Sequence, residues 1–284
     1  MDKQQFRRKV RNYLPHLPSD ILKIFIVLCF LFPFYWMLTT SFKTYNESIV
    51  TPPTFWPNMF TFSAYKSIFF DYNIEMGSYI RNSVVVTAGV IVLQLIIMVP
   101  TAYAFAKYKF YAQEFLFGAV LLAFMIPVQV TFIPIYLMMS KWGMINSLWP
   151  QILPFGANAF GIFLLRQGFK QIPDEIIESA KMDAAGEWKI MWRVMVPMAK
   201  SSMITIALFS FIATWNSYFW PLVITTSDAF RPLTIAIERI RSNEQGMQWN
   251  SIMAGNVLLI IPVIIIYLFA SKKIIQAFTY NGVK

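Results

Sequence analysis

The sequence predicts an all-α integral membrane protein with six transmembrane helices and a charged helical segment at the membrane surface. Three observations support this fold class: the composition, the charge-free apolar runs, and the placement of lysine and arginine. Of the 284 residues, 57% are hydrophobic and 13% are charged, whereas a soluble domain carries about 25% charged residues. This composition is typical of a protein whose helices are embedded in lipid.

Each predicted span is an apolar run close to the roughly 20 residues that a membrane-crossing helix requires. None has Asp, Glu, Lys or Arg in its interior, and most contain or border a proline, which predicts kinked helices packed in a bundle. The predicted spans are residues 24–40, 83–106, 116–139, 148–165, 203–225 and 251–270. They define a transmembrane domain over 24–270, an N-terminal segment over 1–23 and a C-terminal tail over 271–284.

The positive charges predict the orientation of these spans. With the N-terminus inside, 17 of the 24 Lys and Arg residues lie in inner segments and 7 in outer ones. By the positive-inside rule both termini and the loop 166–202 are cytoplasmic. The net charge of +10 therefore reflects membrane topology and not a nucleic-acid surface.

Catalytic and metal-binding chemistry is not indicated. His16 is the only histidine and Cys29 the only cysteine, so no disulfide within the chain is possible and a metal site is not expected. No phosphate-binding G-x-x-x-x-G-K-[ST] motif occurs. We therefore expect no enzyme activity and no cofactor in this chain.

The charged stretch 172–197 lies between two apolar spans and has helical spacing. Pro173 and the acidic residues after it suit a helix start, and Trp188, Met191, Trp192 and Met195 form an amphipathic stripe. These signals predict two short helices with a bend at Gly186. The residues alone allow two interpretations: a membrane-surface helix with a solvated face, or a docking helix whose small side chains let a cytoplasmic partner approach closely.

This stretch resembles the EAA loop of binding-protein-dependent ABC importer permeases. The family pattern is Glu-Ala-Ala, three residues, Gly, nine residues, Ile, one residue, Leu-Pro. Here it reads Glu178-Ser179-Ala180, then Ala184, then Val194, then Val196-Pro197. The Ala184 substitution removes backbone freedom at the expected bend, which Gly186 is expected to supply instead.

Further blocks extend the resemblance over most of the chain, towards the second, six-helix permease of maltose-type sugar importers and the type I importer fold. These blocks are FPFYWMLTTSFK (32–43), RNSVVV (81–86), TAYAFAKYKF (101–110), MIPVQVTFIPIYLM (125–138), FLLRQGFKQIPDEIIESA (163–180), TWNSYFWPLVIT (214–225) and FTYNGVK (278–284). The resemblance implies a prokaryotic plasma-membrane subunit for uptake of sugars or oligosaccharides.

The resemblance also implies partners: a second permease, two ATPase subunits that carry ATP and Mg, and an extracytoplasmic sugar-binding protein. In the family a coupling helix in the EAA loop sits in a cleft on the ATPase. The residues to which this role transfers are Glu178, Ser179, Ala180, Asp183, Ala184, Ala185 and Gly186.

Two further sites are weaker predictions. Polar and aromatic residues in or near the spans suit a sugar path, although an aromatic belt or helix-to-helix hydrogen bonds explain the same residues. They are Trp215, Asn216, Tyr218, Gln129 and Asn158. The outer loop before the last span resembles one that reaches into the binding protein, with a tip at Glu244, Gln245, Gly246 and Met247, or is a plain solvated loop.

Other transport functions remain open at this point. Permeases for glycerol phosphate and related polar solutes are similar in sequence. An ion-coupled secondary carrier is a further alternative, but such carriers usually keep ionisable groups at mid-membrane, which the six runs lack. An intramembrane enzyme would need catalytic groups that the sequence does not display.

Overall fold

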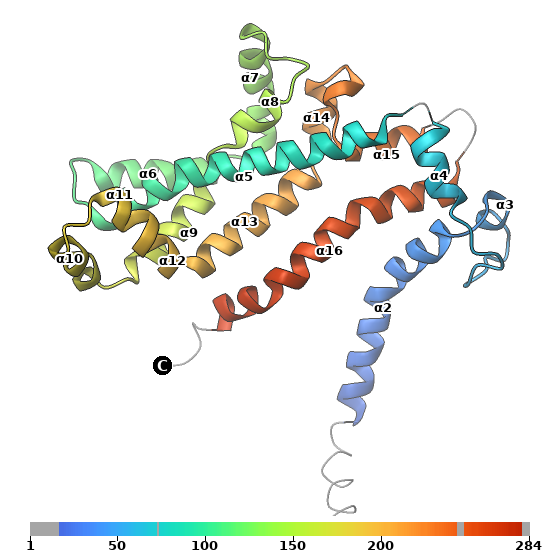
Figure 1. Cartoon of the computed structure of the whole chain (residues 1–284), viewed down its shortest axis with the longest axis horizontal. Helices are drawn as coiled ribbons and strands as arrows, with labels where there is room; N and C mark the ends of the chain where they lie inside the picture. Colours follow the sequence, from blue (N-terminus) through green and yellow to red (C-terminus); the bar gives the residue numbers. More distant parts are fainter. Residues whose placement is uncertain (1–16, 73, 243–246, 280–284) are drawn as a thin grey trace, which may run out of the picture. The chain divides into compact units, whose positions relative to one another are not determined.

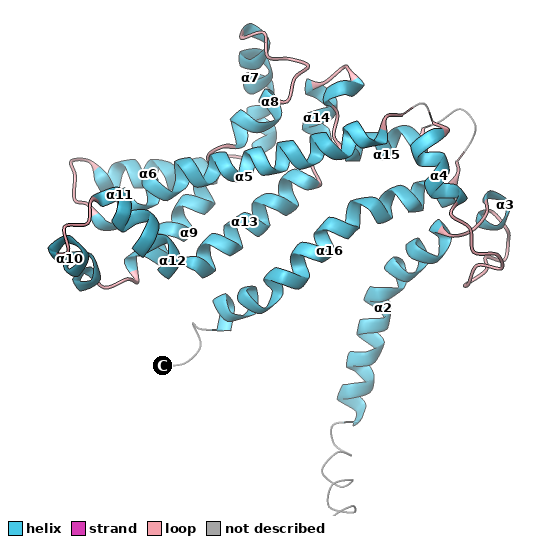
Figure 2. Ribbon diagram, in the orientation of Figure 1, coloured by secondary structure: helices cyan, strands magenta, loops and turns pink. Residues whose placement is uncertain are grey.

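The computed structural model describes residues 17–72, 74–242 and 247–279. Within these ranges every regular element is a helix and no strand occurs (Figure 2). This agrees with the all-α class predicted from the sequence. The α-helices are α2 Leu17–Ser41, α3 Tyr45–Ser48, α4 Ser63–Phe70, α5 Met76–Lys107, α6 Gln113–Phe124, α7 Val128–Lys141, α8 Trp149–Ile152, α9 Ala159–Lys170, α10 Asp174–Met182, α11 Glu187–Ile190, α12 Val196–Met198, α13 Lys200–Trp215, α14 Phe219–Ile224, α15 Leu233–Arg241 and α16 Trp249–Thr279.

Three short elements complete the described ranges. Two are 3-10 helices, η2 at Leu153–Phe155 and η4 at Asp228–Phe230, and one is a π-helix, η3 at Met191–Met195. The chain divides into two compact units, Met1–Ile74 with Ile240–Leu258, and Glu75–Arg239 with Leu259–Lys284.

In the first unit, the segment after α2 contacts the start of α16. Asn250 Nδ2 donates to the backbone oxygen of Lys43 at 3.3 Å, and the Tyr72 hydroxyl donates to Gln248 Oε1 at 2.8 Å. The stretch 51–62 contains Pro52, Pro53 and Pro57 and has neither helix nor strand.

In the second unit, α5 packs along α9 and α13 (Figure 1). Two glycines of α9 permit close approach. A Cβ at Gly161 would lie 2.5 Å from Met98 Sδ, and one at Gly168 would lie 2.8 Å from Ser202 Oγ. The core of the unit is a continuous apolar cluster from α5, α6, α9, α10, α11, η3 and α13.

In the part of the chain that the structure describes, three helices are long and apolar enough to cross a membrane: Pro18–Ser41, Met76–Lys107 and Trp249–Ala270. They correspond to the predicted spans 24–40, 83–106 and 251–270. Prolines lie inside all three, at Pro33, Pro100 and Pro262, as expected for helices whose freed carbonyls neighbours can satisfy.

The other three predicted spans are not single helices. The run 116–139 is split into α6 and α7 with a 98° bend, because Pro127 restricts the preceding residue and starts a new helix. The run 148–165 is divided among α8, η2 and α9, where Asn158 caps α9 by accepting a hydrogen bond from the Gly161 amide. The run 203–225 becomes α13 and α14. Two bent helix pairs, Gln113–Phe124 with Val128–Lys141 and Glu187–Met198 with Lys200–Trp215, are together long and apolar enough to cross a membrane. With each pair counted as one span, the described residues contain up to five candidate spans.

Candidate functional site

The charged segment forms a compact structure, here called the knob, that comprises α10, the turn 183–186 and the first turn of α11. Helix α10 ends in a hydrogen-bonded C-terminal cap: the Ala184 amide donates to Lys181 O and the Ala185 amide donates to Ala180 O, both at 3.0 Å. This pair of bonds defines a Schellman motif, which requires a left-handed residue after the helix end. The knob is therefore two short helices joined by a defined turn, as predicted.

The bend lies at Ala184 and not at Gly186, which corrects the sequence prediction. Ala184 adopts the left-handed region at φ +54°, where a Cβ costs about 1 kcal/mol. Gly186 has φ −70° and ψ 159°, which any residue adopts. Ala184 is also the position at which the family pattern has glycine. The family pattern therefore already indicated that the left-handed residue lies at position 184.

Apolar packing fixes the knob to the spanning helices. Ile177 is buried, and Ile176, Ala180 and Ala185 are half-buried against a cluster that includes Phe169 of α9. Ala180 and Ala185 occupy the two positions whose hydrophobic contact usually accompanies a Schellman cap, and both pack against this cluster. This cluster continues into α5 and α13, so the knob is joined to those helices by continuous apolar packing.

Four polar contacts lie in or beside the knob, and side chains of α5 donate three of them. The Tyr103 hydroxyl of α5 donates to Glu187 Oε2 at 2.9 Å, and Lys181 Nζ lies 2.9 Å from Glu187 Oε1. At the end of α5, Lys107 Nζ donates to Ile172 O at 2.5 Å and to Asp174 Oδ1 at 2.6 Å. The hydrogen bond and positive charge of Lys107 lower the pKa of the Asp174 carboxyl.

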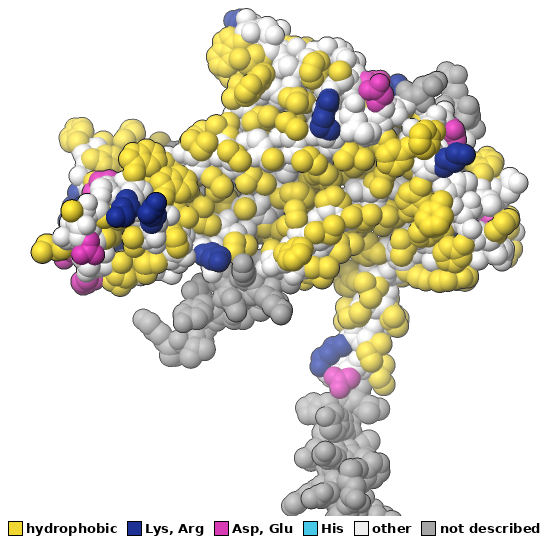
Figure 3. All heavy atoms as spheres, viewed as in Figure 1, with side chains coloured by type: hydrophobic (Ala, Val, Ile, Leu, Met, Phe, Trp, Pro, Cys, Tyr) yellow, Lys and Arg dark blue, Asp and Glu magenta, His cyan; other side chains and the backbone are white. Residues whose placement is uncertain are grey.

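The predicted coupling residues divide into two groups. Glu178, Ser179, Asp183, Ala184 and Gly186 are exposed, whereas Ala180 and Ala185 face the core. The side chains of Glu178 and Asp183 have no hydrogen bond or ion pair to another described residue. Charged side chains gather over α10 and α11, while hydrophobic ones cover the middle of α5 (Figure 3).

The predicted amphipathic stripe is only partly buried. Met191 and Met195 are buried and Trp192 is half-buried, but Trp188 is 68% exposed. The backbone changes to a π-helix at Met191–Met195, which alters the register that ideal α spacing assumes. Trp188 and Met182, at 88% exposed, are therefore large apolar side chains on the surface of the knob.

The five predicted path residues do not form a common site. Trp215 is buried, donates from Nε1 to Leu259 O at 2.9 Å and stacks on Phe211. Asn216 donates to Ile212 O of its own helix, and Asn158 caps α9. Tyr218 and Gln129 are exposed. No hydrogen bond links any two of the five, all of which lie in the described part of the chain.

A buried polar contact inside the spans involves Gln94 and Ser210. Gln94 of α5 donates from Nε2 to Phe155 O at 2.8 Å, and its Oε1 accepts from Ser210 of α13. Gln94 is 4% exposed and Ser210 is 6% exposed. The contact joins three segments of the chain. Because the side-chain groups of Gln94 and Ser210 are already hydrogen-bonded to protein partners, the contact does not by itself offer a ligand site.

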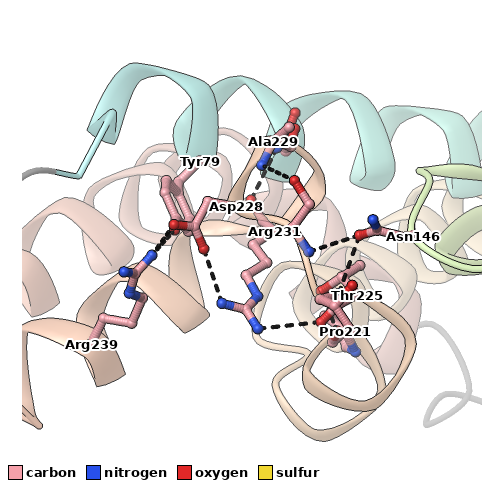
Figure 4. Close-up of polar contacts among 11 residues, drawn as sticks. Tyr79, Asn146, Pro221, Thr225, Asp228, Ala229, Arg231 and Arg239 are labelled. Carbon is pink, nitrogen blue, oxygen red and sulfur yellow. Dashed lines mark hydrogen bonds and ion pairs between the residues drawn. The ribbon is translucent and has the colours of Figure 1, made fainter.

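At the other end of α5 lies a second polar site, here called the Asp228 cluster: Tyr79, Asp228, Arg231 and Arg239 (Figure 4). Asp228 lies between the two arginines. Arg231 NH1 is 2.9 Å from Asp228 Oδ1, and Arg239 NH1 binds Asp228 Oδ2 and lies 3.0 Å from the Tyr79 hydroxyl. Burial raises the pKa of Asp228, but hydrogen bonds from Arg239 and Tyr79 outweigh it, so its pKa is lowered.

Hydrogen bonds to backbone groups hold the loop around Asp228. Asn82, fully buried on α5, donates to Ala229 O at 2.8 Å and Arg231 O at 3.1 Å. Asn146 Oδ1 accepts from the amides of Thr226 and Ser227 at 3.2 and 2.8 Å (Figure 4). The loop therefore has a fixed shape before α15 begins.

The predicted binding-protein loop is only partly described. Glu244, Gln245 and Gly246 lie outside the described residues, whereas Met247 is described and 46% exposed. Among the described residues, no group of three or more His, Cys, Asp and Glu side chains could hold a metal ion.

The knob and the Asp228 cluster lie at opposite ends of one helix. Tyr79 and Tyr103, their contacts on α5, are 24 residues apart, or about 36 Å along the axis at 1.5 Å per residue. The hydrocarbon core of a bilayer is about 30 Å thick. The length of α5 is therefore sufficient to place the two sites on opposite sides of a membrane.

Comparison with known families and proteins agrees with the sequence resemblance. Residues 96–279 match the family described as binding-protein-dependent transport system inner membrane component. The chain is 28% identical over 259 residues to the diacetylchitobiose uptake system permease protein NgcG of Streptomyces coelicolor, covering 90% of this chain and 85% of NgcG. It is 29% identical over 276 residues to the sn-glycerol-3-phosphate transport system permease protein UgpE of Brucella abortus, covering 95% and 96%.

A third relative and a solved structure are similar over most of their length. The arabinooligosaccharides transport system permease protein AraQ of Halalkalibacterium halodurans is 28% identical over 262 residues, covering 92% of this chain and 93% of AraQ. A chain of a bacterial ABC transporter involved in import of the acidic polysaccharide alginate superposes with a TM-score of 0.80 at 26% identity, covering 96% and 98%.

The family match spans well over half of the chain, and the superposition confirms the type I importer permease fold. The relatives are permease subunits and not enzymes, as the sequence predicted. The chain belongs to the family of binding-protein-dependent transport system inner membrane components.

Proposed function

We propose that this protein is a permease subunit of an ATP-driven importer for sugars or oligosaccharides, and that the knob is its coupling helix. The observation that carries the proposal is the construction of the knob. It is packed onto α5, α9 and α13, yet the carboxylates of Glu178 and Asp183 have no partner among the described residues. A rigid exposed element at the end of a spanning helix suits the transfer of a rigid-body shift.

The partners follow from this role. A second permease completes the translocation path, two ATPase subunits bind ATP and Mg, and an extracytoplasmic binding protein delivers sugar. The chain crosses the membrane six times if α2, α5, α6–α7, α8–α9, α13–α14 and α16 each form one span. Both termini and the knob are then cytoplasmic, and the Asp228 cluster and residues 244–247 face the binding protein.

The substrate class rests on the relatives. NgcG and AraQ are named for diacetylchitobiose and arabinooligosaccharides, which favours a saccharide. Glycerol phosphate is the second candidate, because UgpE is equally similar and covers slightly more of the chain. Uptake assays with labelled saccharides and glycerol phosphate, using the reconstituted importer, distinguish the two. The path residues remain a prediction.

Charge reversal on the knob tests the coupling role. Glu178→Lys is preferable to a bulky change at Ala180, because Ala180 packs inward and its replacement would disturb the core. We expect Glu178→Lys to abolish uptake and substrate-stimulated ATP hydrolysis while membrane insertion is retained. Glu175→Lys is the matched control, since Glu175 is exposed on the same helix outside the predicted docking set.

The two variants are compared in one assay of uptake, ATPase co-purification and membrane abundance. Normal uptake by Glu178→Lys would contradict the proposal, as would equal loss in both variants. Loss of abundance in Glu178→Lys alone would instead assign the residue a structural role.

A further inference from the structure

The segment after α2 exposes an unusual set of large apolar side chains. Residues 48–65 contain no charged residue. Among them, five side chains are more than half exposed, namely Phe55 at 64%, Trp56 at 59%, Met59 at 64%, Phe60 at 54% and Phe62 at 71%. A loop in water would rarely present so much apolar surface in one place.

This segment folds back beside α2 and does not project beyond its end. The Tyr35 hydroxyl donates to the backbone oxygen of Phe55 at 2.8 Å, and the Phe55 ring meets Trp36 edge-on at 6.1 Å between centroids. Tyr35 precedes the helix end at Ser41 by six residues, or about 9 Å along the axis. Phe55 therefore lies at the depth of the last apolar turns of α2.

The two charged side chains that precede residues 48–65 bind to groups within that segment. Lys43 Nζ donates to Thr54 O and lies 4.6 Å from the centre of the Trp36 ring. The Glu47 carboxylate accepts from Thr54 Oγ1 at 2.9 Å and from the Asn58 amide at 2.8 Å. The two charges of this region are thus used to fix the loop, and they leave the large apolar side chains of residues 55–62 on its surface.

The position along α2 identifies what covers this surface. None of the most apolar part of α2 is buried within the structure, as expected of a helix in contact with lipid or another subunit. The apolar run of α2 ends at the polar residues Thr39, Thr40 and Ser41. Aromatic side chains accumulate at this boundary because their amphipathic rings are stable at headgroup level. The Trp56 and Phe60 rings pack against each other at 5.4 Å and form one continuous patch.

We propose that residues 52–62 are a membrane-interface anchor that inserts Phe55, Trp56 and Phe60 among the lipids at the Ser41 end of α2. The anchor would hold the first span at a fixed depth and rotation. Its partner is the lipid surface itself, and the required chemistry is the apolar and aromatic area described above.

Depth-sensitive fluorescence tests the anchor in the assembled importer. In a Cys29→Ser background, Trp56→Cys is labelled with an environment-sensitive fluorophore, in vesicles of phosphatidylethanolamine and phosphatidylglycerol. Asn46→Cys, on the exposed surface of α3, is the matched control. We expect a lipid carrying a nitroxide near its headgroup to quench the Trp56→Cys label several-fold more than the control, and iodide in the water to show the reverse order.

Two outcomes overturn the proposal. Quenching by iodide equal to that of the control places the loop in water, and protection from both quenchers shows that another protein covers it. Phe60→Cys serves as a second labelling position if Trp56→Cys does not assemble. Neither result depends on whether the knob binds an ATPase, so failure here leaves the proposed function unaffected.

Discussion

The two ends of α5 are built in opposite ways. At one end the knob is held mainly by apolar packing, with Ile177 buried and Asp174 76% exposed. At the other end the Asp228 cluster is held by polar contacts, and its charges are paired with one another. The knob leaves the carboxylates of Glu178 and Asp183 unpaired on its surface among the described residues, whereas the Asp228 cluster pairs its carboxylate with two arginines.

The largest expected effect tests the apolar attachment of the knob. Phe169 is completely buried and packs edge-on against Tyr103. Phe169→Ala should reduce the free energy of unfolding by about 3–5 kcal/mol because it leaves a cavity. Thermal unfolding in detergent measures the loss, and faster protease cleavage at Lys181 reports loosening of the knob. Phe209→Ala, on a half-exposed side chain of α13, is the control and should change little.

A smaller effect is expected for the polar attachment at the other end. Asn82→Leu removes the donors to two carbonyls of the Asp228 loop, and each unsatisfied buried group costs about 1–3 kcal/mol. Hydrogen exchange of the backbone amides at 228–233 should accelerate. Asn216→Leu is the control, because that amide bonds only within its own helix. Unchanged exchange in Asn82→Leu would show that the loop is held by other contacts.

The turn of the knob provides a more precise comparison. Ala184→Gly should stabilise the protein by about 1 kcal/mol, since glycine adopts the left-handed conformation without the Cβ penalty. Gly186→Ala should be nearly neutral, because its φ is ordinary and no atom lies within 4 Å of the added Cβ. Melting temperatures of the two variants check both statements. The opposite order would place the bend at Gly186 after all.

The smallest expected effect is on the stability of the folded protein at low pH. The pKa of Asp174 and that of Asp228 are both lowered in the folded protein. The contributions of both carboxylates to folding stability are therefore present above the unfolded-state pKa of about 4. These contributions are lost as the pH falls through the pKa of the folded state. Asp228→Asn should remove more of the acid dependence of the melting temperature than Asp174→Asn, because the exposed Asp174 pair is screened by solvent. Equal effects would contradict the contrast between the two ends.

The sequence predicted those features that are written in local patterns. Helices α2, α5 and α16 follow from long charge-free runs, and the knob follows from its charges, Pro173 and the family motif. Even the position of the left-handed residue was indicated, since Ala184 occupies the place of the family glycine. Assigning the bend to Gly186 assumed that a nearby glycine would supply the turn, whereas the hydrogen bonds of the cap require it at Ala184.

The features that escaped prediction depend on distant segments. Tyr79, Asp228 and Arg239 come from three elements, and Arg239 follows Tyr79 by 160 positions, so no local spacing joins them. Likewise Gln94 and Ser210 find each other only once α5 and α13 are packed. The path residues were chosen by chemical type alone, and the structure shows Trp215 and Asn158 engaged in helix packing and capping.

The corner between α6 and α7 has a consequence for its surroundings. One helix ends and another begins within residues 124–128, so amide and carbonyl groups without intrahelical partners collect there. All the residues from 121 to 130 are exposed. Acyl chains offer no hydrogen bonds, and irregular backbone at that depth is tolerated only against protein or water. Within a bilayer, the outer side of this corner would therefore border an aqueous cavity or a neighbouring subunit, and not lipid acyl chains.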